Sequence, residues 1–126
     1  VHGNVLLVDD FPLDIDNDAL SWYRSSLDSI IGQENYSIWE IGNELPYSSS
    51  DVSANLNYFQ SVVWFSAYLG FEAYHDAENS IYSYVMNGGN IFLNITEIRD
   101  TTFSFFPLDS IFYFSRNCLI LNGSFK

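Results

Sequence analysis

The stretch NVLLVDD, residues 4–10, decides the fold class of this chain. Its apolar run does not alternate with polar residues, which is typical of a strand buried on both faces of a parallel sheet. Residues 9–35 separate this run from the next strand-like segment, 36–41 (YSIWEI). That spacing suits a helical crossover and is far too long for a hairpin. The first two strands are therefore expected to be parallel.

Working outward from this start, strands and helices alternate along the chain. Apolar side chains at helical spacing predict helices over 18–31 and 76–87, with a short helix from Asp51 between them. β-Branched and aromatic runs predict further strands at 61–66, 90–95 and 118–121, whereas 101–115, which Pro107 interrupts, gives no clear element.

This order predicts an α/β domain with three layers and a doubly wound, mainly parallel sheet of the flavodoxin-like or amidotransferase-like kind. An α+β domain with an antiparallel sheet is the alternative. We expect one domain over 1–126, cut from a longer protein and truncated at the C-terminus, because the chain starts without Met and ends directly after an apolar run.

Composition excludes several classes of protein. The chain has 126 residues, of which 16 are Asp or Glu and 4 are Lys or Arg, and its formal net charge is −12. Scattered cations on such an acidic chain exclude nucleic acid as a partner, and no apolar run is long enough for membrane insertion. One cysteine and two histidines rule out an intramolecular disulfide and a cysteine-rich zinc site.

Four pieces of the chain resemble the class I glutamine amidotransferase-like domain, in the degenerate form found within large secreted bacterial proteins. They are VLLVDD at 5–10 with the following Trp22-Tyr23, YSIW at 36–39, YFQSVVWFS at 58–66 and YSYVMNGGNIFL at 82–93. The resemblance implies a flavodoxin-like fold and an extracellular, periplasmic or cell-surface location. The opening is also similar to receiver domains of response regulators, but the third strand ends in Phe65-Ser66-Ala67 without the phosphoacceptor Asp, and the only lysine is Lys126.

The catalytic positions of the amidotransferase-like family are missing from this chain. Active members carry a cysteine nucleophile in a G-x-C-x-G turn after the strand that follows the Gly-Gly pair. The matching stretch here, 94–98 (NITEI), has no cysteine and no glycine. Thr96 offers a hydroxyl, but an unactivated hydroxyl is a weak nucleophile. Cys118 lies later in an apolar run and is expected in the core, so an enzyme is the less favoured interpretation.

An acidic cluster follows the first strand. It consists of Asp9, Asp10, Asp14, Asp16 and Asp18. Doubly wound domains bind ligands at the carboxyl ends of their strands, and carboxylates suit Ca²⁺ or Mg²⁺. A calcium loop counted from Asp14 would need glycine where Ala19 stands and glutamate where Ser25 stands. We therefore expect no bound cofactor and a solvated loop that caps the next helix, with a metal site as the alternative.

The same edge provides the candidate ligand site, formed by Ser66, Tyr68 and Thr96. Aromatic loop residues beside carboxylates suit a sugar or peptide ligand; alternatively, this loop covers its own core. The large aromatic side chains elsewhere are expected in the core: Trp22, Trp39, Trp64 and Phe65.

Two functions follow from these observations. The first is a non-catalytic structural or interaction domain, able to bind a ligand, whose partners are the other domains of a larger secreted or cell-surface protein. The alternative is a hydrolase or metal-assisted enzyme that uses the acidic edge.

Overall fold

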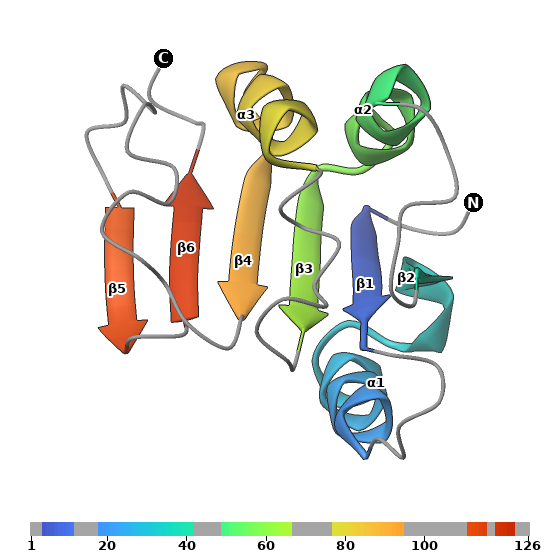
Figure 1. The fold of residues 1–126 in the computed structure, drawn as a ribbon. Helices are drawn as coiled ribbons and strands as arrows, with labels where there is room; N and C mark the ends of the chain where they lie inside the picture. The colour runs from blue at the N-terminus through green and yellow to red at the C-terminus, as the bar shows by residue number, and fades with distance from the viewer. Residues whose placement is uncertain are drawn as a thin grey trace.

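The computed structural model describes residues 4–11, 18–41, 49–66, 77–94, 111–115 and 118–122, with backbone alone for 49–50 and the last two ranges. In this part of the chain, helices and strands alternate as the sequence predicts (Figure 1). The elements are β1 (Val5–Asp10), α1 (Ala19–Ile30), a 3₁₀ turn η1 (Gln33–Asn35), β2 (Tyr36–Glu40), α2 (Ser49–Asn57), β3 (Ser61–Ser66), α3 (Glu78–Met86), β4 (Asn90–Asn94), β5 (Ile111–Ser115) and β6 (Cys118–Asn122).

The strands form one sheet in the order β2-β1-β3-β4-β6-β5. β1 pairs in parallel with β2 and β3, and β3 pairs in parallel with β4. The order of these four strands is that of flavodoxin-like doubly wound sheets. The predicted α/β class with a mainly parallel sheet is confirmed, and the antiparallel alternative is wrong for these four strands.

The far end of the sheet differs from this parallel arrangement. β6 pairs antiparallel with both β4 and β5, so the last two strands form a hairpin at the edge (Figure 1). β5 lies in a segment that has no clear strand pattern in the sequence. Its partner β6 was expected as a strand, and the structure shows that β6 runs antiparallel to β4.

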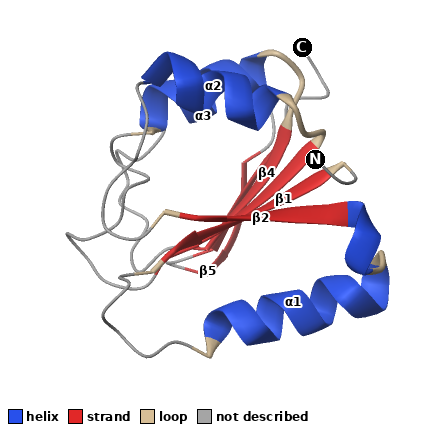
Figure 2. Cartoon of the chain, turned by 90° about the vertical axis from the view of Figure 1, so that its right-hand side faces the viewer, coloured by secondary structure: helices blue, strands red, loops and turns tan. Residues whose placement is uncertain are grey.

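Helices cover the sheet on both faces (Figure 2). α1 lies on one face and α2 and α3 lie on the other. After β2 the order of the strands reverses, because β3 is added on the other side of β1. The connecting helices then lie on the opposite face of the sheet. This reversal creates a switch point between the carboxyl ends of β1 and β3, where doubly wound domains bind ligands.

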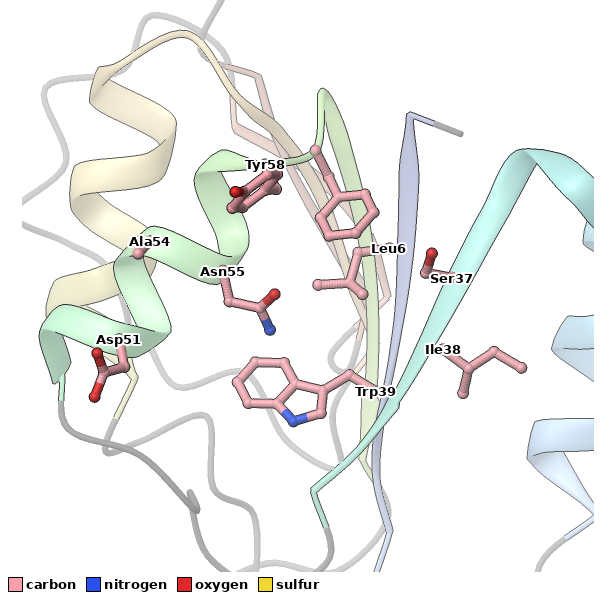
Figure 3. Close-up of a pocket in the computed structure, with 9 residues that line it drawn as sticks. Leu6, Ser37, Ile38, Trp39, Asp51, Ala54, Asn55 and Tyr58 are labelled. Carbon is pink, nitrogen blue, oxygen red and sulfur yellow. The ribbon is translucent and has the colours of Figure 1, made fainter. Parts of the chain in front are cut away.

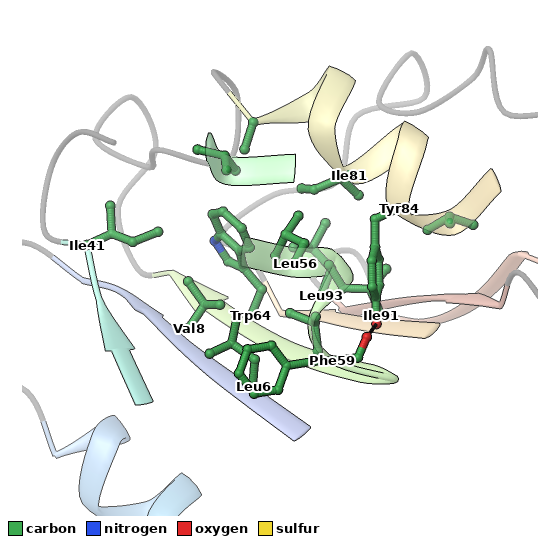
Figure 4. Packing of buried hydrophobic residues seen from close by; sticks show 14 residues of the cluster. Leu6, Val8, Ile41, Leu56, Phe59, Trp64, Ile81, Tyr84, Ile91 and Leu93 are labelled. Carbon is green, nitrogen blue, oxygen red and sulfur yellow. Dashed lines mark hydrogen bonds between the residues drawn. The ribbon is translucent and has the colours of Figure 1, made fainter. Parts of the chain in front are cut away.

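The core divides into two clusters, one on each face of the sheet. Because side chains alternate along a strand, Leu6 and Val8 face α2 and α3, while Leu7 faces α1. The larger cluster surrounds Trp64 and Tyr84, both of which are almost fully buried (Figure 4). The predicted apolar stripe of α3 contributes to this cluster.

Glycines follow the ends of two helices. After α1, the amides of Ile31 and Gly32 donate to the Leu27 carbonyl, and Gly32 has φ of 87°. Gly88, after α3, has φ of 98°. Residues with a Cβ rarely adopt these angles, so glycine allows the chain to leave each helix sharply.

Trp22, which was expected in the core, is exposed, and so is Ile30 at the end of the same helix. Trp22 and Ile30 of α1 have 64% and 76% of their surface accessible. Only the side of α1 that carries Tyr23 and Leu27 faces the sheet. Each residue turns the helix by about 100°, so Trp22, directly before Tyr23, points away from the sheet. Trp39 is half-buried at the margin of the larger cluster.

Candidate functional site

The carboxyl end of β1 places two aspartates at the switch point. Asp9 and Asp10 are the last residues of the strand, which continues two residues beyond its apolar run. Asp10 is completely buried and Asp9 is 6% exposed. The expectation of a solvated loop is wrong for these two carboxylates. Successive strand residues point to opposite faces, so the two carboxylates lie on different sides of the sheet.

Asp10 faces the α2 and α3 side, where Trp64 holds it. The Trp64 indole Nε1 donates a hydrogen bond to Asp10 Oδ2 at 3.0 Å, and both side chains are fully buried. Ser66 lies opposite Asp10 in the β1–β3 register, as expected for a residue at this edge. Its buried hydroxyl has no hydrogen-bond partner within the described part of the chain.

Asp9 faces the α1 side, where aromatic rings pack against the strand ends. The amide of Phe11 donates to Asp9 Oδ1 at 3.0 Å. Tyr23 of α1 stacks on Phe65 with ring centroids 4.5 Å apart. Asn94, the last residue of β4, donates from Nδ2 to the Tyr23 hydroxyl at 2.8 Å. The two Tyr23 contacts anchor α1 to the ends of β3 and β4.

The remaining members of the predicted site are not brought together. Asp18 is the residue before α1, but its side chain makes no capping hydrogen bond and its backbone is helical, with φ of −82° and ψ of −6°. Asp18 therefore does not supply the expected cap, and the rest of the loop, 12–17, lies outside the described residues. Asp14, Asp16, Tyr68 and Thr96 lie outside the described residues. Within the described ranges, no three His, Cys, Asp or Glu side chains gather where they could hold a metal ion.

A groove lies away from this edge, between β2 and α2 (Figure 3). Its volume is about 750 Å³. Figure 3 shows Trp39 pointing from β2 toward α2, while Ile38 points to the other side of the sheet. The lining combines apolar and aromatic surface with a few polar groups: Leu6, Ser37, Ile38, Trp39, Asp51, Ala54, Asn55, Tyr58 and Phe59.

A second, smaller groove lies on the α1 side of the same strand. Its volume is about 470 Å³, and Arg24, Gln33, Tyr36, Ser37 and Ile38 line it. The Tyr36 hydroxyl donates to Asp28 Oδ1 at 2.6 Å. Burial, together with this hydrogen bond, raises the pKa of Tyr36.

Family models, curated proteins and solved structures were compared with the chain, and none matches. The resemblance to amidotransferase-like domains therefore rests on four sequence pieces alone. Among the helices that the structure describes, none is long and apolar enough to cross a bilayer.

Sequence reasoning did not find the two grooves. It placed Trp39 in the core, and it used Tyr58 only as part of a resemblance. Two signals were available. Tyr58 lies outside the apolar stripe of Val52, Leu56 and Phe59, and it is 73% exposed. Residues 36–40 also carry Ser and Glu among apolar side chains, a mixture typical of an edge strand.

Proposed function

We propose that this chain is a non-catalytic interaction domain, able to bind a ligand, of a larger secreted or cell-surface protein. The observation that carries the proposal is that both carboxylates at the switch point, Asp9 and Asp10, are buried and hydrogen-bonded. Asp10 accepts a hydrogen bond from the buried Trp64 indole, and Asp9 accepts one from the Phe11 amide. Asp10 thereby links β1 to β3, and Asp9 fixes the turn of the chain directly after β1.

Their placement also argues against shared catalytic work. A pair of carboxylates acts as acid and base only when both reach the same substrate atoms. Asp9 and Asp10 lie on opposite faces of the sheet, and Asp10 is 0% exposed. A substrate that reached one of them would be separated from the other by the backbone of β1.

The sequence supports the same proposal independently. The chain has neither the cysteine nor the glycines of the amidotransferase turn at 94–98. The secreted or cell-surface setting comes from the family resemblance and is the part of the proposal that the fold does not address. The partners proposed are neighbouring domains of the parent protein and a sugar or peptide ligand.

Activity assays on the purified chain test the non-catalytic role. We expect no ammonia release from glutamine, and the variant Cys118→Ser should behave like the parent chain in the same assay. Glutamine hydrolysis lost in Cys118→Ser would overturn the proposal.

One observation favours the hydrolase alternative. The Ser66 hydroxyl is buried, lacks a partner within the described residues and lies opposite Asp10. A fluorophosphonate, which labels activated serines, tests this hydroxyl directly. We expect no labelling, because Asp10 already binds Trp64. Labelling that disappears in Ser66→Ala would establish the hydrolase alternative.

A further inference from the structure

The outer edge of β2 is open along the described part of the chain. β2 is the terminal strand of the sheet and pairs only with β1 there. The Ile41 amide, directly after the strand, donates to the Asp9 carbonyl at 2.9 Å. Because backbone groups point alternately to the two sides of a strand, Ile38 and Glu40 direct their N–H and C=O groups away from β1. These groups are available to a further strand.

The two grooves flank this edge, one on each face of the sheet. The larger groove lies on the α2 side and the smaller on the α1 side, and Ser37 and Ile38 line both. A strand added to the edge would direct successive side chains alternately into the two grooves. Edge pairing supplies backbone hydrogen bonds, and pockets for alternate side chains supply specificity.

We propose that the outer edge of β2 binds an extended, basic peptide segment by strand addition. The proposal rests on the interaction role given above and names the partner and the place. β2 has five residues, so a peptide of about five to seven residues covers it.

The lining of the larger groove indicates which side chains the peptide carries on that face. Trp39, Tyr58 and Phe59 offer aromatic surface to aliphatic side chains. Asp51, in the first turn of α2, is exposed at the same groove. This carboxylate, on a chain of net charge −12, favours lysine on this face of the bound segment.

The smaller groove favours short polar side chains on the other face of the peptide. Tyr36, Gln33 and Arg24 line it with a phenol, an amide and a guanidinium. The Tyr36 hydroxyl already donates to Asp28. A threonine hydroxyl can accept from the Gln33 amide or the Arg24 guanidinium, whereas a lysine would meet the charge of Arg24. A second copy of this chain is the poorer occupant, because each copy would bring a further charge of −12.

Titration of the ¹⁵N-labelled chain tests the proposal with the blocked peptide acetyl-KTITITK-amide. Its isoleucines and lysines share one face and its threonines the other. We expect saturable binding with a dissociation constant below about 1 mM. Shift changes should centre on the amides of Ile38 and Glu40, whose hydrogen exchange should slow. The acidic counterpart acetyl-ETITITE-amide should bind at least tenfold more weakly.

Matched variants distinguish backbone pairing at the edge of β2 from nonspecific binding of the peptide. Ile38→Pro removes the N–H group that points away from β1 and leaves every hydrogen bond to β1 in place. Edge strands tolerate proline at such outward-facing positions. It should weaken binding of the basic peptide at least tenfold, while Ile38→Ala, which keeps the N–H, should change it less than threefold. Asp51→Asn should reduce the preference for the basic peptide. Trp22→Ala, an exposed aromatic on the other side of α1, should bind like the parent chain.

Several outcomes would overturn the inference. They are no saturable binding, equal binding of both peptides, shifts that avoid β2, or self-association of the chain through β2 in sedimentation. If Ile38→Pro fails to fold, the shifts and exchange of the parent chain and the Asp51→Asn result still decide. Catalytic activity would overturn the proposed function and leave this titration unchanged, so the two failures are distinguishable.

Discussion

Trp64 and Asp10 form a buried pair in which each side chain depends on the other. Their hydrogen bond joins β3 to β1 at 3.0 Å inside the larger core cluster. Trp64→Phe removes the donor and leaves a buried carboxylate with one partner fewer, which should lower the free energy of unfolding by about 2 to 4 kcal/mol. Urea unfolding measures this loss.

The double variant separates the free energy of the Asp10–Trp64 hydrogen bond from the cost of the side-chain volume that Trp64→Phe removes. Once Trp64→Phe has removed the donor, Asp10→Ala loses less than it does alone, because the carboxyl group no longer has that bond to lose. We expect a coupling energy of about 1 to 3 kcal/mol, with the double variant more stable than the two single losses predict. Strict additivity would show that the indole contributes only its volume.

Tyr84 supplies a pH-dependent test of the core at the same scale. It is 1% exposed, and its hydroxyl lies 3.0 Å from the Phe59 carbonyl oxygen and 3.3 Å from that of Asn90. Burial raises the pKa of Tyr84 to about 12 from 10.0. The unfolded chain therefore loses this proton first as the pH rises, and the folded state loses stability between about pH 10 and pH 12.

The stability difference between the parent chain and Tyr84→Phe isolates this effect. At pH 7 the variant should be less stable by about 1 kcal/mol, because it lacks the hydroxyl hydrogen bond. The stability difference should then move by about 2 to 3 kcal/mol in favour of the variant as the pH rises toward 12, so that its sign reverses. Tyr36, whose pKa is also raised, is present in both proteins and cancels. A difference that stays constant above pH 10 would contradict the buried phenol.

At the scale of the element, the sequence could predict where helices form and end, but it could not predict how they are capped. The apolar stripes of α2 and α3 and the stop at Gly32 were predictable, because periodicity and backbone conformation are local properties. The cap at Asp18 was not, since capping depends on how the preceding loop enters the helix. The carboxyl ends of β1 and β3 were placed correctly, but the burial of Asp9 and Asp10 depends on α1 and on Trp64, which lies far along the chain.

Asp18, the residue before α1, yields an element-scale prediction. Replacing an N-cap aspartate by alanine usually costs about 1 kcal/mol. Asp18 makes no side-chain cap bond, so Asp18→Ala should lose only its interaction with the positive end of the helix, about 0.3 to 0.5 kcal/mol. Thermal unfolding at low and high salt distinguishes the two cases, because the charge effect is screened and a hydrogen bond is not. A loss above about 1 kcal/mol that persists in high salt would restore the predicted cap.

For the whole molecule, the four parallel strands were predictable, and the antiparallel edge strand β5 was not. Buried strands such as β1 are recognised in the sequence by unbroken apolar runs. β2 was predicted as a strand, but its mixed sequence, YSIWE, marks neither its open edge nor the grooves beside it. The proposed functional surface thus lies where the sequence pattern is weakest, at the outer edge of β2.

Net charge provides the test at this largest scale. The chain carries −12, so self-repulsion destabilises the compact state and any added salt should raise the melting temperature. A specific calcium site with a dissociation constant of about 10 μM would add about 2.7 kcal/mol at 1 mM Ca²⁺. For a domain of this size that corresponds to a shift of about ten degrees.

We expect a much smaller shift with 1 mM Ca²⁺, below about two degrees. NaCl at equal ionic strength should reproduce it, because general screening acts without a site. Asp16→Asn should change it little, since the variant alters one acidic group out of sixteen. Differential scanning calorimetry with CaCl₂, MgCl₂ and NaCl makes the comparison. A large shift that only Ca²⁺ produces, and that Asp16→Asn removes, would make the acidic segment after β1 a metal site and would favour the metal-assisted enzyme over the interaction domain.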